Sequence, residues 1–249
     1  MSQITIQDLS FTYDGDHVPV FQHLDLQLDT RWKLGLVGRN GRGKTTLLRL
    51  LEGSLSGSGA LTRPDRPVYF PRPADEPERP AREEWMLLRE LNRLGLSEEI
   101  LERPFSSLSG GEQTRAGLAR LFCQEDGYPM LDEPTNHLDE AGRALTARYL
   151  RGLDRGFLLV SHDRAFLDAC TDHTLALNRT GPEVVQGNFS VWYREKERRD
   201  QREIARNEAL RGEIRRLEQA SRRTSLWSDR VEQSKYGSQN SGLRPDRGY

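Results

Sequence analysis

A glycine-rich run that follows a short apolar stretch constrains the fold of this chain more than any other feature. Residues 32–37 are mainly apolar and are predicted to form a buried strand, and residues 38–45 read GRNGRGKT. This run matches the pattern G-x-x-x-x-G-K-[ST] between a strand and a helix. Its glycines allow successive backbone N–H groups to turn toward phosphate oxygens, and the following helix directs its positive end at the same anion. Although a glycine-rich turn can also open an ordinary helix, the chain is predicted to contain an α/β domain with a phosphate-binding loop.

The side chains of this loop and of a second segment suit a nucleoside triphosphate with Mg²⁺. Lys44 offers a positive charge to the β- and γ-phosphates, and Thr45 offers its hydroxyl to Mg²⁺. After a second predicted strand, Asp132 is placed to hold the magnesium shell and Glu133 to polarise the attacking water. Taken alone, these two carboxylates could equally be a solvated acidic pair. The predicted nucleotide-binding residues of the loop are Gly38, Arg39, Asn40, Gly41, Arg42, Gly43, Lys44, Thr45 and Thr46.

Apolar spacing divides the chain into a larger domain and an appendage. Alternating apolar and polar residues before residue 30 predict antiparallel strands, and strands that alternate with helices up to residue 160 predict an α/β core with a parallel sheet. The proline- and charge-rich stretch 63–82 is predicted to be a loop, and Pro129 to delay or distort the strand before Asp132. We expect one domain over residues 1–190, with a helical part at about 80–125.

The appendage, residues 191–249, differs in character from the rest of the chain. Between residues 191 and 234 there is no proline, and apolar residues such as Ile204, Leu210 and Ile214 lie on one stripe of a predicted helix. An apolar stripe this narrow cannot bury enough surface by itself, so the helix is expected to pack against a partner, as in a coiled coil. Residues 192–249 hold 15 of the 37 basic and 10 of the 38 acidic residues, so this segment carries +5 and the preceding chain −6. A basic helical linker that ends in a glycine-rich turn is therefore expected after a mildly acidic domain.

Cysteine content and hydropathy favour a cytoplasmic location. Cys123 and Cys170 are the two cysteines, too few for a disulfide framework, and they fit a reducing compartment. The first residues lack a basic region followed by an apolar run, and no apolar stretch approaches the ~18 residues that span a bilayer. If the domain powered transport, we would expect the membrane channel to be another chain.

A serine- and glycine-rich motif gives the chain its family resemblance. Residues 107–113 read SLSGGEQ, residues 136–139 read NHLD and residues 161–163 read SHD. In this order, and after the phosphate-binding loop, they resemble the motifs of ABC ATPases over about residues 3–190. The resemblance implies a P-loop NTPase (RecA-like) ABC cassette with an antiparallel β subdomain and a small helical subdomain. It also implies ATP and Mg²⁺ as ligands.

The same resemblance implies roles for further residues. The signature residues, whose helix would face the γ-phosphate bound by the opposite cassette, are Ser109, Gly110, Gly111 and Glu112. Asp139 resembles the D-loop aspartate, and His162 resembles the switch histidine that contacts the γ-phosphate and acts beside the catalytic Glu133. Tyr13 resembles the aromatic residue that stacks on adenine, although it could equally be a core residue of a strand.

Residues 132–139 (DEPTNHLD) and 161–168 (SHDRAFLD) resemble the ABC-F proteins in particular. Residues 187–193 (GNFSVWY), the charged helix and residues 235–249 (KYGSQNSGLRPDRGY) together resemble one subgroup of this family. Proteins of this family are soluble ATPases whose two cassettes are joined by a long helical linker. In the subgroup associated with antibiotic resistance, the linker tip enters the ribosome near the peptidyl-tRNA. The resemblance implies an ATPase that acts on the ribosome, with residues 191–249 near rRNA and tRNA. A motor subunit of an ABC transporter and a nucleotide-binding regulatory module with little turnover are the alternatives.

Two departures from the family pattern bear on the site. Arg72 stands where the family usually has the glutamine of the Q-loop, and since an arginine cannot present an amide oxygen, Arg72 is given no role. The sequence contains one cassette, whereas a composite ABC site takes its signature from a second one. A fragment, a truncated gene product and a cassette that works as a homodimer all fit this observation. Full ATPase activity is expected to need the second cassette.

Overall fold

The computed structural model describes residues 3–63, 66–71, 84–123, 127–178 and 181–237. The chain divides into two compact units, Met1–Tyr193 and Arg194–Tyr249. The sequence-based boundary lies three residues earlier, at 190/191. Arg72 lies outside the described residues, as do residues 238–249 of the glycine-rich turn expected at 236–249. The first two residues of that expected turn, Tyr236 and Gly237, still belong to a helix.

The N-terminal strands form a three-stranded antiparallel sheet. β1 (Gln3–Phe11) pairs with β2 (Phe21–Asp29) on one side and with β4 (Ser58–Thr62) on the other. Alternate apolar residues such as Ile4 and Ile6 are fully buried, which is the pattern of a sheet with one face on the core. The predicted antiparallel strands are confirmed, and β4 is an additional strand.

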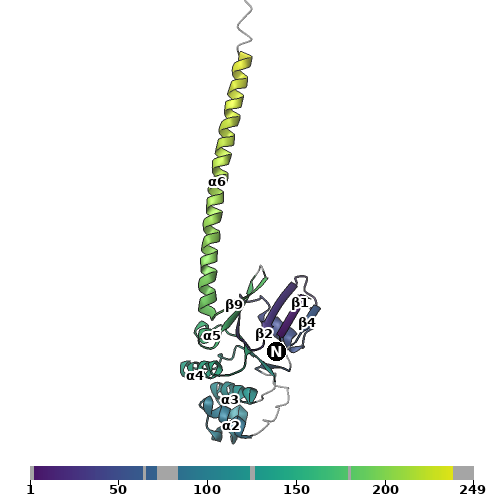
Figure 1. Ribbon diagram of the computed structural model, residues 1–249, viewed down its shortest axis with the longest axis vertical. Helices are drawn as coiled ribbons and strands as arrows, with labels where there is room; N and C mark the ends of the chain where they lie inside the picture. The colour runs from purple at the N-terminus through teal and green to yellow at the C-terminus, as the bar shows by residue number, and fades with distance from the viewer. Residues whose placement is uncertain (1–2, 64–65, 72–83, 124–126, 179–180, 238–249) are drawn as a thin grey trace, which may run out of the picture. The chain divides into compact units, whose positions relative to one another are not determined.

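A six-stranded sheet in the order β5-β6-β7-β3-β8-β9 forms the centre of the first unit (Figure 1). Five strands run parallel to their neighbours, and the last is antiparallel to β8. All four residues of β7 are buried, as expected for a parallel sheet that is covered on both faces. The strands are β3 (Lys33–Val37), β5 (Pro67–Phe70), β6 (Tyr128–Asp132), β7 (Phe157–Val160), β8 (His173–Asn178) and β9 (Gly181–Gln186).

Two predictions about this sheet are wrong. The stretch 63–82, predicted to be a loop, contains the edge strand β5, in which Val68 and Phe70 join one apolar cluster and Tyr69 packs against the other. Pro129 does not delay β6, which begins one residue earlier at Tyr128 and pairs Pro129 with Val68. Pairing with β7 begins only at Met130, so the missing N–H of proline falls where two-sided pairing starts.

Helices cover the central sheet and build the predicted helical part. Glu90 of α2 lies 1% exposed and accepts a hydrogen bond of 2.7 Å from the hydroxyl of Tyr149 in α4. This bond ties the helical part to the α/β core. The helices of this unit are α1 (Lys44–Glu52), α2 (Glu84–Arg93), η1 (Glu98–Leu101), η2 (Phe105–Ser107), α3 (Gly110–Phe122), α4 (Glu140–Arg151) and α5 (Arg164–Cys170).

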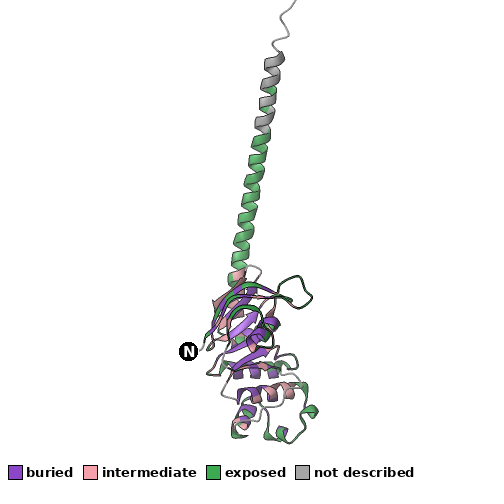
Figure 2. Ribbon diagram, turned by 90° about the vertical axis from the view of Figure 1, so that its right-hand side faces the viewer, coloured by how far each residue is buried: buried purple, intermediate pink, exposed green. Residues whose placement is uncertain are grey.

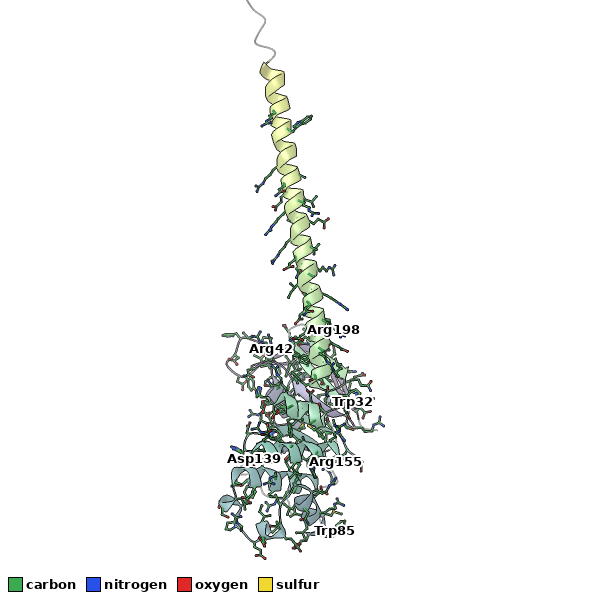
Figure 3. All side chains as sticks on the ribbon, turned by 90° about the vertical axis from the view of Figure 1, so that its left-hand side faces the viewer. Trp32, Arg42, Trp85, Asp139, Arg155 and Arg198 are labelled. Atoms are coloured by element: carbon green, nitrogen blue, oxygen red, sulfur yellow. The ribbon has the colours of Figure 1, made fainter. Side chains whose placement is uncertain are left out.

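A single helix, α6 (Phe189–Gly237), runs from the first unit into the second. Its first turn belongs to the first unit: Trp192 is buried, and Phe189 stacks on Tyr193 with ring centroids 5.7 Å apart. The described side chains of residues 197–222 are exposed (Figure 2), and they project from the helix on several sides (Figure 3). The predicted charged helix is thus present and begins at residue 189.

Candidate functional site

The loop after β3 brings two glycines to the N-terminus of α1, where an anion can bind. Gly41 and Gly43 have φ angles of 77° and 85°, in the left-handed region that other residues avoid. At Gly43 a Cβ would lie 2.6 Å from Cγ1 of Val20, so no other residue fits there. Gly43 is also the N-cap of α1 and makes no side-chain cap. The first N–H groups of α1, at the positive end of the helix, are therefore available to a phosphate.

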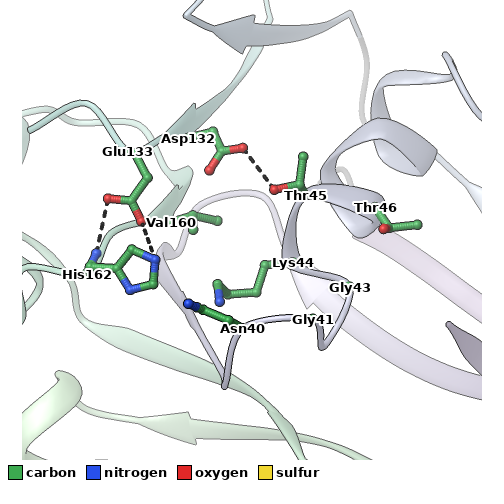
Figure 4. A pocket seen from close by; sticks show the side chains of 10 residues that line it. All are labelled: Asn40, Gly41, Gly43, Lys44, Thr45, Thr46, Asp132, Glu133, Val160 and His162. Atoms are coloured by element: carbon green, nitrogen blue, oxygen red, sulfur yellow. Dashed lines mark hydrogen bonds and ion pairs between the residues drawn. The ribbon is translucent and has the colours of Figure 1, made fainter. Parts of the chain in front are cut away.

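These residues line one open cavity of about 310 Å³ (Figure 4). Lys44 is half-buried there, and its Nζ donates a hydrogen bond of 2.9 Å to the carbonyl oxygen of Gly38. The cavity collects side chains from three segments that are far apart in the sequence. Its lining residues are Asn40, Gly41, Gly43, Lys44, Thr45, Thr46, Asp132, Glu133, Val160 and His162.

Asp132 lies at the end of β6 and accepts two hydrogen bonds on one oxygen. The Thr45 hydroxyl donates to Oδ2 over 3.2 Å, and the Tyr69 hydroxyl donates to the same atom over 2.6 Å. Burial, and then the bond to Asp132, raise the pKa of Tyr69 above its ordinary value, so the phenol stays a donor. Sequence analysis missed Tyr69 because it assigned this stretch to a loop. The run of residues 68–70, one β-branched and two aromatic, was the signal for a strand.

Glu133 follows directly and is held in an unusual conformation. Its φ is 52°, and its N–H donates to the carbonyl of Val160 over 2.9 Å. The carboxylate accepts a hydrogen bond of 3.2 Å from the backbone N–H of His162 and lies 3.4 Å from Nε2 of that imidazole. Burial raises the pKa of Glu133 above its ordinary value, while the contacts with His162 act in the opposite direction. A carboxylate with a raised pKa is suited to accept a proton near neutral pH.

Some predicted ATP-binding residues lie outside the lining of the cavity. Arg39 is exposed, and the backbone N–H of Arg42 donates to the carbonyl of Arg39 over 3.2 Å. Tyr13 is half-buried, and its hydroxyl lies 3.0 Å from Oγ1 of Thr46. Its ring packs edge-on against Phe11. Tyr13 was expected either to stack on adenine or to be a core residue of a strand. Within this chain it packs at the margin of the core.

The predicted signature residues also lie outside this cavity. Ser109 caps α3: its hydroxyl accepts from the N–H of Glu112 over 3.3 Å, and the Glu112 carboxylate accepts from the N–H of Ser109 over 2.8 Å. The hydrogen bonds that the backbone N–H and the hydroxyl of Ser109 each donate to the Glu112 carboxylate, both over 2.8 Å, lower the pKa of Glu112. A Cβ on Gly110 would lie 3.1 Å from Cβ of His137. The N-terminus of α3 thus packs closely against the segment that precedes Asp139.

Asp139 acts as a helix cap within this chain. Its Oδ1 accepts a hydrogen bond of 2.8 Å from the N–H of Gly142 at the start of α4, which is the usual role of an N-cap aspartate. It is not among the residues that line the cavity.

The donor set of the cavity fits a magnesium ion that is shared with phosphate. Thr45 and Asp132 offer a hydroxyl and a carboxylate, the hard oxygen ligands that Mg²⁺ prefers. Within the described ranges, no group of three or more His, Cys, Asp and Glu side chains could hold a metal by itself. A metal held here would therefore take most of its ligands from water and from the nucleotide, as Mg²⁺ commonly does.

The hydropathy of the helices gives one further finding. None of the helices that the structure describes combines the length and the apolar character needed to cross a membrane.

Comparison with protein families and with curated proteins matches the region of these motifs. The family described as ABC transporter matches residues 21–87 and 70–136. Human ATP-binding cassette sub-family F member 3 is 31% identical over 205 residues, which are 76% of this chain and 29% of that protein. The ribosome protection protein VmlR of Bacillus subtilis is 29% identical over 238 residues, 92% of this chain and 41% of that protein. The chain thus spans less than half the length of these relatives.

A solved structure shares the fold. A bacterial Atm1-family ABC exporter with ATP bound matches 78% of this chain and 40% of its own with a TM-score of 0.62, at 18% identity. At this identity the likeness concerns the fold alone.

Proposed function

This chain is an ABC cassette of the ABC-F type, matched to its relatives over part of their length, and on that premise we propose that it binds ATP with Mg²⁺ and hydrolyses it. One observation carries the proposal: Lys44, Asp132 and Glu133, from different segments, line a single cavity beside the N-terminus of α1. A charge for the phosphates, a ligand for the metal and a proton acceptor are thus brought together.

Each residue has a distinct part in the proposed reaction. Lys44 would leave the Gly38 carbonyl and bind the β- and γ-phosphates, which the N–H groups of the loop also bind. When bound, Mg²⁺ would supply positive charge that stabilises the phosphate oxygens. Glu133 would accept a proton from the water whose oxygen forms a bond to the γ-phosphorus, while the bond to the ADP oxygen breaks. His162 would hold the Glu133 carboxylate in place through the two contacts described above.

We further propose that hydrolysis needs a second cassette. Ser109, Gly110 and Gly111 begin α3 outside the cavity that holds Lys44. The positive end of a helix that does not line the cavity of its own cassette suits an anion held by another cassette. A second copy of the chain, or another cassette of a longer protein, would supply the missing half.

The rate of ATP hydrolysis by the isolated chain is therefore expected to depend on protein concentration. Since two cassettes must meet, turnover per chain should be low in dilute solution and should rise with concentration until a dimer saturates. Steady-state phosphate release measured over a range of concentrations, beside light scattering for mass, tests this. A high turnover that does not change with concentration, from a chain that stays monomeric, would refute the need for a second cassette.

For residues 191–249 we propose a helical linker that acts on the ribosome. The similarity to VmlR, a ribosome protection protein, extends over 92% of this chain. The segment carries +5, a charge that favours RNA phosphate. Ile204, Ile214 and Leu217 are more than half exposed. A returning helix would cover them, as in a helical hairpin.

Binding of the full chain to ribosomes should weaken steeply with salt, because arginine contacts release counterions from RNA phosphate. Replacing the exposed residues Arg211, Arg215 and Arg216 of α6 by glutamine should reduce the slope of log affinity against log salt by about one for each arginine that contacts phosphate. Co-sedimentation with purified ribosomes between low and high salt measures the slope.

The matched control replaces three exposed arginines of the first unit, Arg31, Arg148 and Arg151, in the same way. It removes equal charge and should leave the slope close to that of the unmodified chain. Equal effects of the two triple variants would point to nonspecific charge, and a full chain that never sediments with ribosomes would count against the ribosomal role.

A further inference from the structure

Tyr69 lies beside the site, but it has no role in the reaction proposed above. It lies in β5, the edge strand next to β6, and in this parallel pair it stands opposite Met130, two residues before Asp132. Its ring is half-buried against the apolar cluster that also contains the leucines of α1. The hydroxyl therefore reaches Asp132 from a ring that is fixed by packing.

The bond between Tyr69 and Asp132 is the shorter of two that end on the same oxygen. At 2.6 Å it has the length of a charge-assisted bond from a hydroxyl to a carboxylate, whereas Thr45 reaches Oδ2 over 3.2 Å. Both hydroxyls donate to Oδ2. Among the described residues, none donates a hydrogen bond to Oδ1. Two donors on one oxygen fix the rotation of a carboxylate and leave its other oxygen for a further ligand. Figure 4 shows this carboxylate between Thr45 and Glu133.

The two donors differ in what a metal would do to them. Thr45 is itself a proposed ligand of Mg²⁺, so its hydroxyl would turn from Asp132 to the ion when the ion binds. Tyr69 does not line the cavity and has no such alternative. After the metal binds, Tyr69 remains the donor that holds Asp132.

The neighbouring residue fixes β5 from the opposite side. Phe70 is buried, and a Cβ on Gly117 of α3 would lie 2.8 Å from its Cε2. Since successive side chains of a strand point to opposite faces, packing of Phe70 on α3 and the bond from Tyr69 to Asp132 anchor the same four-residue strand on both faces.

We propose that Tyr69 is a positioning residue of the metal site: it holds the Asp132 carboxylate in the orientation that receives the magnesium shell, and so sets the Mg²⁺ concentration at which ATP binds tightly. The inference rests on the proposed binding of ATP with Mg²⁺. Partners that orient metal ligands are commonly worth tenfold or more in metal affinity.

The test compares the full chain with Tyr69→Phe, which keeps the ring and removes the hydroxyl. Affinity for a fluorescent ATP analogue is measured first in EDTA and then across a titration with Mg²⁺. In EDTA the two proteins should bind equally, because Lys44 and the loop are unchanged. The Mg²⁺ concentration that gives half of the full gain in affinity should rise by roughly tenfold or more in the variant.

Tyr149→Phe is the matched control, since Tyr149 also donates its hydroxyl to a buried carboxylate, that of Glu90, over 2.7 Å. It lies outside the lining of the cavity, so its Mg²⁺ dependence should match that of the unmodified chain, whatever its melting temperature. A double-mutant cycle with Asp132→Asn adds a second readout: the effect of Tyr69→Phe should disappear when the carboxylate is already gone.

Three results would overturn the proposal. They are an unchanged Mg²⁺ dependence in Tyr69→Phe, an equal shift in Tyr149→Phe, and effects of Tyr69→Phe and Asp132→Asn that simply add. A failure of the proposed ATP-binding function would give another result: the unmodified chain would not bind the ATP analogue at saturating Mg²⁺.

Discussion

Replacing Lys44 by alanine is expected to abolish measurable ATP binding by the full chain. The Lys44 ammonium is half-buried in a cavity that, within the described residues, holds the carboxylates of Asp132 and Glu133 and the imidazole of His162. Without Lys44, the phosphates would meet two negative side chains, and the N–H groups of the loop and the Mg²⁺ would offset this repulsion without the charge of the ammonium. Loss of a buried charged partner costs about 2–5 kcal/mol, which is roughly 30-fold or more in Kd.

Calorimetry with ATP and Mg²⁺ measures this loss directly. Lys196→Ala is the control, because it removes a lysine of α6 that lies outside the lining of the cavity, and its affinity should equal that of the unmodified chain. If Lys44→Ala retained the affinity of the unmodified chain while its melting temperature was unchanged, the cavity beside α1 would not be the nucleotide site.

Glu133→Gln should leave ATP binding intact and lower hydrolysis by about 100- to 10,000-fold, the usual contribution of a positioned proton acceptor. The amide has the shape of the carboxylate but cannot accept the proton of the attacking water. Any dimer that forms with ATP should last longest in this variant. Phosphate release under single-turnover conditions and dimer lifetime by gel filtration measure the two effects.

The pH profile of the unmodified chain gives an independent check on Glu133. Because burial raises the pKa of this carboxyl, its proton-accepting form is lost as the pH falls through a value above the usual range of glutamate. Hydrolysis should fall over the same pH interval. Glu84→Gln, at an exposed position of α2, should keep both the rate and the profile. Turnover by Glu133→Gln near that of the unmodified chain would remove Glu133 from the role of base.

Short-range patterns were sufficient to predict most of the cassette. The loop at 38–45 and the carboxylates at 132 and 133 are separated by almost ninety residues, yet both follow strands of one parallel sheet. Since the carboxyl ends of parallel strands meet at one edge of the sheet, the two motifs could be placed together without a structure. The alternation of strands and helices up to residue 160 was likewise predicted from apolar spacing, and β7 and α4 belong to it.

Features that depend on contacts between distant residues were not predicted. β5 has four residues in a proline-rich stretch, and its pairing with β6 makes it a strand. Because the strand was not predicted, the contact of Tyr69 with Asp132 was not predicted either. The hydrogen bonds from Tyr13 to Thr46 and from His162 to Glu133 likewise join residues more than twenty-five positions apart, and no local pattern reports the distance between their side chains.

The backbone of Glu133 ties the thermal stability of this chain to its turnover. A glutamate at a φ of 52° lies in the left-handed region, which costs about 1 kcal/mol or more for a residue with an ordinary side chain, whereas asparagine visits it readily. One substitution at this position would therefore relax the backbone and remove the proton acceptor together. Selection of variants for thermal stability alone would therefore favour cassettes that bind ATP but do not hydrolyse it. Engineering of this chain for higher thermal stability would need to select for ATP hydrolysis at the same time.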